Sequence, residues 1–289
     1  MMHKLNTINK SNIFYYKIYG MAFETNVEIN LLQKLNDKPI GTNPRIILKN
    51  QINFLDDGIK INKLNDKYIL SISNTLSYTI DENEICCYTK DYQSFISTLF
   101  NIPFSIFFLL RGEFLLHASS IVYNKKLILF CAKKGVGKST LVNMLNNKEL
   151  MLFGDDTIRV TNSNVGYRAF NYSKLYYETS LDLGCITSSQ TNLAGKHYIY
   201  FDCNLEQASI GKLCLLTRDE KTYIEPLNNH KDFFKKNIVG IEYMPVELLQ
   251  KILTIENDSC KAYLLHINND YRKYLLEKDV LIDIIKNID

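Results

Sequence analysis

The chain is predicted to be an α/β protein in which a small β-rich module, residues 1–90, precedes an α/β domain, residues 91–289. Before residue 90, short segments alternate polar and apolar residues, and Asn, Asp and Gly separate them, which is typical of strands joined by turns. After residue 90, segments with helical spacing alternate with apolar, strand-like segments. That alternation is typical of an α/β sheet.

The expected elements follow from these patterns in chain order. Six strands rich in β-branched and aromatic residues are expected in the first module, at 13–19, 45–48, 58–61, 68–72, 76–80 and 85–88. Residues 92–110 have helical spacing, and the expected helix is kinked at Pro103 and ends at Arg111-Gly112. Further strands are expected at 114–122, 126–131, 150–153, 198–202, 212–217 and 261–267, and helices at 138–145, 231–237, 245–253 and 276–287.

Composition and charge narrow the function classes. The chain has 289 residues, of which 46% are hydrophobic and 22% charged, and its net charge is +3. This charge is too small to favour nucleic acid or a membrane surface as the main partner. Residues 1–10 are polar and lack an apolar signal core, so a cytoplasmic location is expected. Residues 95–110 are apolar but too short to span a bilayer.

The cysteines indicate neither a disulfide framework nor a zinc site. Their number is odd, and no C-x-x-C pair or Cys/His cluster has zinc-ligand spacing. We therefore expect buried or incidental thiols in a reducing compartment. The residues are Cys86, Cys87, Cys131, Cys185, Cys203, Cys214 and Cys260.

Residues 127–145 are the most informative stretch, because an apolar strand, a glycine loop and a helix follow one another without interruption. Gly135 and Gly137 allow the backbone amides to point inward, toward phosphate. Lys138 can reach the outer phosphates of a nucleotide, and the Ser139 hydroxyl can bind Mg²⁺. Ala132 replaces the first glycine of the G-x-x-x-x-G-K-[ST] pattern and would be strained at positive φ. The predicted nucleotide cradle consists of Lys133, Lys134, Gly135, Val136, Gly137, Lys138, Ser139 and Thr140.

Two further features lie next to this loop. Asp155 and Asp156 directly follow the strand at 150–153, and two adjacent carboxylates favour a nearby cation. They are either a solvated turn or, beside a phosphate loop, a metal ligand and a catalytic base. His117 is on the strand before the one that enters the loop, so a hairpin can bring it near the nucleotide. A hydrogen-bonded core histidine is the alternative for His117, and the other four histidines are interpreted as surface or structural residues.

Three segments together resemble the catalytic core of the HPr kinase/phosphorylase-like proteins. They are RGEFLLHASS at 111–120, KLILFCAKKGVGKST at 126–140 and LFGDD at 152–156. The resemblance is greatest to the shorter HPr-kinase-related proteins encoded with peptide-modifying enzymes, including those of lasso-peptide clusters. It implies a fold related to phosphoenolpyruvate carboxykinase, ATP and Mg²⁺ as cofactors, and phosphorylation of a serine hydroxyl. The matching positions are His117, Gly137, Lys138, Ser139, Asp155 and Asp156.

The resemblance also implies roles for these residues. Lys138 would bind the phosphates, Asp155 would be the base, and Ser139 with Asp156 would bind Mg²⁺; the reverse assignment of the two aspartates stays open. His117 would orient phosphate or substrate. The substrate would be a peptide or protein carrying a serine, in particular a ribosomally made precursor peptide. Because a hydroxyl alone supplies too little contact to select one target, docking on residues 1–90 is also expected.

The sequence leaves several points open. Glu178 and Lys196 lie where another active-site residue is expected, but neither receives a role. The acceptor peptide and the oligomeric state, including a homo-oligomer, are undetermined. Two other functions are considered: a P-loop ATPase that transfers no phosphate, and a nucleotide-dependent peptide-binding protein.

Overall fold

A computed structural model shows the protein as two compact units. It describes residues 12–288 except 31, 33, 53–57, 162, 164, 169–172, 178–188, 192–196, 202–204, 229–235 and 254–260. The N-terminal unit comprises Met1–Leu115 with Ile238–Ile255, and the C-terminal unit comprises Leu116–Asn237 with Glu256–Asp289. Both contain helices and a multi-stranded sheet, so the α/β class is confirmed.

The N-terminal unit is built on a seven-stranded sheet of order β1-β2-β3-β7-β6-β5-β4. The strands are β1 (Phe14–Ile18), β2 (Met21–Thr25), β3 (Arg45–Lys49), β4 (Lys60–Leu64), β5 (Lys67–Ser73), β6 (Leu76–Ile80) and β7 (Glu84–Thr89). Strands β4 to β7 pair antiparallel in chain order, whereas β3 pairs parallel with both β2 and β7. Tyr19 and Gly20 both have positive φ in the turn between β1 and β2, as a tight hairpin turn requires.

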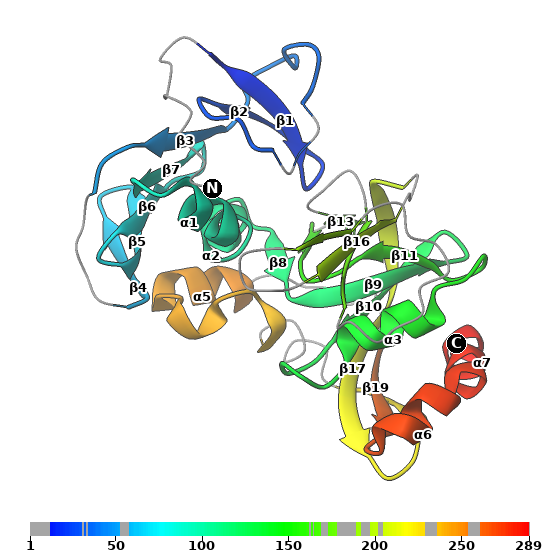
Figure 1. Ribbon diagram of the computed structural model, residues 1–289. Coiled ribbons are helices and arrows are strands. Elements are labelled where there is room, and N and C mark those ends of the chain that lie inside the picture. Colours follow the sequence, from blue (N-terminus) through cyan, green and yellow to red (C-terminus); the bar gives the residue numbers. More distant parts are fainter. Residues whose placement is uncertain are drawn as a thin grey trace. The chain divides into compact units, whose positions relative to one another are not determined.

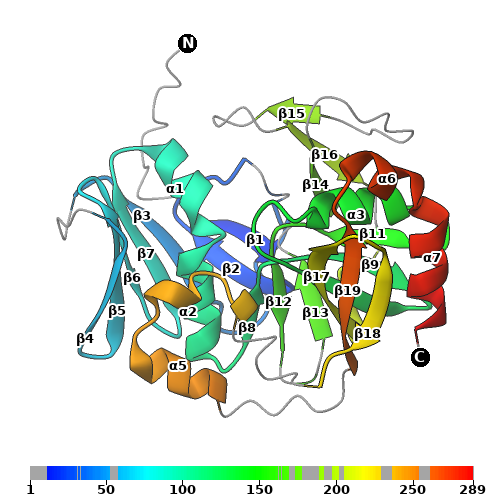
Figure 2. The same cartoon turned by 90° about the horizontal axis from the view of Figure 1, so that it is seen from below.

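Helices α1 (Tyr92–Leu99), α2 (Ile102–Leu110) and α5 (Val246–Leu253) complete this unit (Figure 2). Helix α1 packs on β7, and α2 packs on β6, β7 and α5. In α2 seven consecutive residues, 103–109, are buried. Tyr19 and Phe23 pack against Phe104, with ring centroids 5.4 Å apart in both pairs. Because these helices pack on the sheet, the compact N-terminal unit extends past residue 90, the boundary expected from the sequence.

The expected single helix at 92–110 is two helices. Helix α1 ends at Leu99, and Asn101 is the residue that caps α2. Pro103 lies in the first turn of α2, where backbone N–H groups have no partner within the helix, so the missing N–H of proline costs no hydrogen bond. The proline therefore begins a new helix instead of kinking a continuous one.

The C-terminal unit contains a larger mixed sheet (Figure 1). Its main strand order is β11-β9-β10-β17-β13-β12, and β19 and β18 extend it from β17; the boundary between the units falls within β8. The strands are β8 (Phe114–Leu116), β9 (Ala118–Tyr123), β10 (Lys126–Cys131), β11 (Met151–Gly154), β12 (Ile158–Val160), β13 (Val165–Arg168), β17 (Gln207–Asp219), β18 (Tyr223–Pro226) and β19 (Lys261–Asn268). A separate three-stranded sheet has the order β14 (Ser173–Tyr177), β16 (His197–Phe201) and β15 (Ser189–Thr191).

Helices α3 (Lys138–Leu145), α6 (Tyr271–Leu276) and α7 (Lys278–Asn287) belong to this unit. Helix α3 packs on β9, β11 and α7, and α6 packs on β19 (Figure 1). Ile128 and Phe130 of β10 share one apolar core with Leu141 and Leu145 of α3. Five consecutive residues of β10, 127–131, are buried, which is typical of a strand covered on both faces.

Several predicted elements have different limits in the structure. The strand expected at 114–122 is divided at His117 into β8 and β9, and β17 is longer than the strand expected at 212–217. The helix expected at 276–287 is interrupted at Glu277, which separates α6 from α7. Six short strands have no counterpart among the expected ones, namely β2, β12, β13, β14, β15 and β18. Most of the helix expected at 231–237 lies outside the described residues.

Among the described helices, none is by itself long and apolar enough to cross a membrane. Helices α1 and α2 are long and apolar enough only when taken together, and they are bent by 51° at the break between them.

Candidate active site

The predicted site residues converge at one edge of the larger sheet. Strands β10, β17 and β19 are parallel, and β11 runs in the same direction because both β10 and β11 pair antiparallel with β9. Their carboxyl ends therefore lie at the same edge, which is where α/β sheets bind ligands. The glycine loop, residues 132–137, follows β10 at this edge, and Asp155 follows β11. His117 directly precedes Ala118, which pairs with Cys131 at the end of β10.

The glycine loop has the backbone that its sequence predicts. Gly135 has φ 85° and Gly137 has φ 116°, a region that favours glycine. Gly137 caps α3, and its carbonyl accepts the first helical hydrogen bond, 2.9 Å from Leu141 N. Ala132 does not have positive φ and is buried against the core. The alanine is therefore not strained at the position where the pattern has its first glycine.

Lys138 is held under this loop. The residue is 8% exposed, and Nζ donates a 3.2 Å hydrogen bond to the carbonyl oxygen of Ala132. Burial lowers the pKa of Lys138 from its ordinary value. A buried cation whose charged form is destabilised gains from a neighbouring anion, so this position suits a phosphate group. Among its loop neighbours, Lys133 and Lys134 are exposed, whereas Val136, Ser139 and Thr140 are partly buried.

Asp155 is contacted by two serine hydroxyls from different elements. Ser139 Oγ, in the first turn of α3, donates a 3.0 Å hydrogen bond to Asp155 Oδ1. Ser119 Oγ, on β9, donates to the same oxygen, and Ser119 is fully buried. The next residue, Ser120, donates a 3.0 Å hydrogen bond to the carbonyl oxygen of Gly154. Together these bonds attach the end of β11 to β9 and α3.

Asp156 has different surroundings from Asp155. Its Oδ1 lies 3.7 Å from His117 Nε2, and the two side chains are 72% and 44% exposed. Asp156 has φ 78°, a backbone conformation uncommon for a residue other than glycine. The amide of His117 donates a 2.8 Å hydrogen bond to the carbonyl oxygen of Asn237. The two adjacent carboxylates therefore have different partners, one facing the loop serine and the other an accessible imidazole.

Arg218 also reaches the site, and sequence reasoning missed it. It lies near the end of β17, and Nη1 donates a 2.6 Å hydrogen bond to the carbonyl oxygen of Asn268. Its guanidinium lies over the ring of Tyr274, 4.9 Å from the centroid. A Cβ atom built on Gly137 would come 3.0 Å from Arg218 Nη2, so this cation lies directly beside the glycine loop. The signal available in the sequence was a charged pair, Arg218-Asp219, at the end of an apolar strand.

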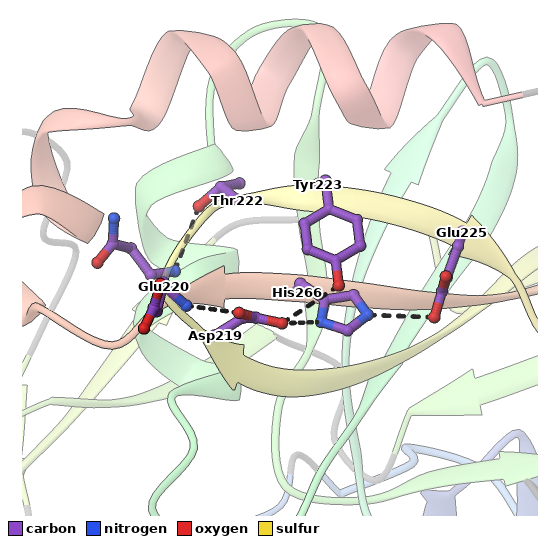
Figure 3. A network of polar contacts seen from close by, with 7 residues as sticks. Asp219, Glu220, Thr222, Tyr223, Glu225 and His266 are labelled. Atoms are coloured by element: carbon purple, nitrogen blue, oxygen red, sulfur yellow. Dashed lines mark hydrogen bonds and ion pairs between the residues drawn. The ribbon is translucent and has the colours of Figure 1, made fainter.

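His266, on the neighbouring strand β19, is held by a polar network (Figure 3). Its Nδ1 lies 2.9 Å from Asp219 Oδ2 and its Nε2 lies 3.3 Å from Glu225 Oε1. The ring of Tyr223 stacks on the imidazole, with centroids 3.9 Å apart. The amide of Glu220 and the ring of His266 both bond Asp219 and lower the pKa of its carboxyl group. His266 is thus a hydrogen-bonded structural residue, as interpreted from the sequence.

The side chains at this site offer few ligands for a metal ion. Among the described residues, no group of three or more His, Cys, Asp or Glu side chains is arranged to hold a metal ion. Ser139 Oγ and Asp155 supply two oxygens side by side, which fits Mg²⁺ only when phosphate oxygens and water complete its coordination.

Two other groups of residues were singled out in the sequence. Glu178 and Lys196 lie outside the described residues. Cys86, Cys87, Cys131 and Cys214 are buried free thiols, as expected for these four.

Comparison with known proteins finds structural similarity among solved structures but no match by sequence. No protein-family model and no curated protein sequence matches the chain. Among solved structures, the Hpr(Ser) kinase/phosphatase from Coxiella burnetii is similar to 58% of this chain and 88% of its own, with 13% identity and a TM-score of 0.32.

Proposed function

We propose that the protein is an ATP- and Mg²⁺-dependent kinase that phosphorylates a serine hydroxyl on a peptide or protein. One arrangement carries the proposal: at one sheet edge, a glycine loop covers a buried lysine, and the following serine contacts one of two adjacent aspartates. The motifs that resemble HPr-kinase-related proteins support the same reading. A ribosomally made precursor peptide is the proposed substrate.

Binding of the nucleotide would depend on the loop. The amides of residues 133–140 and the N-terminus of α3 would face the phosphates, and Lys138 would exchange its bond to Ala132 for a phosphate oxygen. Arg218 would add a second positive charge beside Gly137. Mg²⁺, held by Ser139 and one carboxylate, would neutralise phosphate charge as it develops.

The contacts favour an exchange of the two aspartate roles expected from the sequence. Both serine hydroxyls occupy Asp155 Oδ1, so this oxygen is the less available proton acceptor. Asp155 is therefore proposed on the metal side, with Ser139. Asp156 is exposed and next to His117, so it is proposed as the base, with His117 orienting it or the substrate.

The proposed step is an in-line displacement. The serine oxygen would form a bond to the γ-phosphorus, the bond from that phosphorus to the β–γ bridging oxygen would break, and ADP would leave. The hydroxyl proton would pass to Asp156. Lys138 and Arg218 would stabilise the charge on the transferred group.

The test incubates the full chain with Mg²⁺, γ-labelled ATP and the precursor peptides encoded near its gene. Mass spectrometry should find one or more phosphates on serine, and Lys138→Ala should abolish the label at an unchanged circular dichroism spectrum. ATP hydrolysis without labelled peptide would instead identify a non-transferring ATPase. Peptide binding that requires ATP but consumes none would identify a nucleotide-dependent binding protein.

Residues 1–90 stay the proposed docking region for the peptide, but deleting them is not a suitable test. The deletion would remove all seven strands of the N-terminal sheet and expose the apolar residues of α2. Exposed positions on an edge strand are a better choice. Lys60→Glu with Lys63→Glu, both on β4, should raise the KM for peptide and leave the KM for ATP unchanged if this edge is used.

A further inference from the structure

We infer that Glu277 is a positioning residue that acts on the proposed nucleotide site through Asn268 and Arg218. The inference rests on the proposed function, because Arg218 matters only if the glycine loop binds phosphate. Glu277 lies at the junction of α6 and α7 and does not belong to any predicted motif.

Asn268 is the centre of this arrangement. It is 6% exposed, and four of its polar groups are hydrogen-bonded. Its amide donates to Thr222 Oγ1 at 3.2 Å, and its Oδ1 accepts from the amide of Asp270 at 2.9 Å. Its Nδ2 donates to Glu277 Oε1 at 3.1 Å, and its main-chain carbonyl oxygen accepts from Arg218 Nη1 at 2.6 Å. These contacts from both the main chain and the side chain restrain Asn268, and with it the main-chain carbonyl that accepts from the arginine.

Glu277 is bound through both carboxylate oxygens. Oε1 accepts from Asn268, and Oε2 accepts from the hydroxyl of Thr222. Thr222 in turn lies in the short turn between β17 and β18, next to the Asp219–His266 contact drawn in Figure 3. One carboxylate thus connects the α6–α7 junction, the β17–β18 turn and the end of β19.

The side chain of Arg218 is oriented by contacts with the end of β19 and with α6. The carbonyl of Asn268 and the ring of Tyr274 are its contacts on that side, and Gly137 of the glycine loop lies on the other. A long arginine side chain has many rotamers, so a fixed acceptor and a fixed ring lower the entropy lost when it binds phosphate. Removing Glu277 would release Asn268 and, with it, the guanidinium.

A double-mutant cycle on nucleotide affinity tests this chain of contacts. Binding of Mg²⁺–ATP to the full chain is measured by calorimetry for wild type, Glu277→Ala, Arg218→Ala and the double variant. Glu277→Ala should weaken binding at least threefold in wild type but less than 1.5-fold in the Arg218→Ala background. Glu277→Gln keeps an acceptor and a donor for Asn268 and Thr222, so it should bind within twofold of wild type. Asp279→Ala, which removes an exposed carboxylate two residues further along the chain, is the matched control and should have no effect.

The outcomes separate this inference from the proposed function. If wild type binds Mg²⁺–ATP but Glu277→Ala has no effect, or an equal effect in both backgrounds, Glu277 does not act through Arg218. If wild type binds no Mg²⁺–ATP, the proposed function fails and the inference fails with it. Should Glu277→Ala not fold, Glu277→Met removes both contacts of the carboxylate while keeping most of the side-chain volume, and the same cycle with Arg218→Ala decides the question.

Discussion

The hydroxyl of Ser139 lies 3.0 Å from Asp155 Oδ1, and this contact joins the first turn of the helix after the glycine loop to the end of β11. Asp156, one residue further, is instead 3.7 Å from His117. The two adjacent carboxylates therefore differ in their hydrogen-bond partners and in their exposure to solvent. One shares a partner with the proposed Mg²⁺ ligand, and the other is accessible to an incoming hydroxyl.

This difference predicts distinct kinetic effects for the two aspartates. Asp156→Asn should lower kcat by about 10²- to 10⁴-fold at an unchanged affinity for Mg²⁺–ATP, because it removes the proposed base. Asp155→Asn should raise the Mg²⁺ concentration needed for half-maximal rate, and Mn²⁺ should restore part of the activity. Rate measurements over a Mg²⁺ titration distinguish them. The opposite pattern would return the base to Asp155, and full activity in both variants would make the pair a turn.

Ser119 predicts a further effect on the same carboxylate. Ser119→Ala removes the fully buried hydroxyl that donates to Asp155, so the free energy of unfolding should fall by about 1–2 kcal/mol. The half-saturating Mg²⁺ concentration should also change, since Asp155 Oδ1 then accepts from one serine hydroxyl instead of two. Ser120→Ala is the matched control: it removes a neighbouring buried hydroxyl whose partner is the Gly154 carbonyl. A Mg²⁺ response that is equal in the two variants would show that Ser119 has only a structural role.

The local part of the site could be predicted from the sequence. The apolar run at 127–131, the two glycines and the helix after them are close together in the sequence, so the local pattern predicted strand, loop and helix in order. His117 was placed near the loop on the expectation of a hairpin, and the pairing of Ala118 with Cys131 shows that hairpin. The turn residues Asn124 and Lys125, both at positive φ, close it.

The non-local part could not be predicted. Arg218 reaches the loop only because β17 pairs parallel with β10, a pairing between segments about 80 residues apart that no local pattern specifies. Residues 238–255 belong to the N-terminal unit for the same reason, through the packing of α5 on α2. The contacts of Ser119 were also missed, since a serine in an apolar strand gives no sign of which neighbour its hydroxyl will meet.

The buried charge of Lys138 should make the stability difference between wild type and Lys138→Met depend on pH. Burial lowers its pKa below 10.5, so between the folded pKa and 10.5 the unfolded chain binds more protons than the folded one. The destabilisation from the buried charge is fully present below that window and disappears as the pH rises through it. Lys138→Met lacks this charge and should be at least as stable as wild type at pH 7, with the difference between them decreasing toward pH 10.5.

Urea unfolding of both proteins between pH 7 and 10.5 measures that difference. Lys134→Met, on the exposed side of the loop, is the control and should follow wild type throughout. Lys138→Met should bind no Mg²⁺–ATP although it folds normally. A variant much less stable than wild type at pH 7 would mean that the lysine is stabilised by its bond to Ala132 and is not held ready for an anion.

Substitutions of Gly137 and Gly41 should distinguish the effect of backbone strain on stability from the effect of Arg218 on nucleotide affinity. Its φ of 116° is unfavourable for any other residue, so Gly137→Ala should lower the free energy of unfolding by about 1–3 kcal/mol. The added methyl group would also meet Arg218 Nη2 at 3.0 Å and displace the guanidinium from the loop. Gly41→Ala is the matched control, since Gly41 has φ 98° with nothing within 4 Å of the added atom. Both variants should lose stability in urea unfolding, but only Gly137→Ala should lose affinity for Mg²⁺–ATP, by about tenfold or more for the loss of one charge-assisted contact. Equal affinities in the two variants would place Arg218 and the loop outside nucleotide binding.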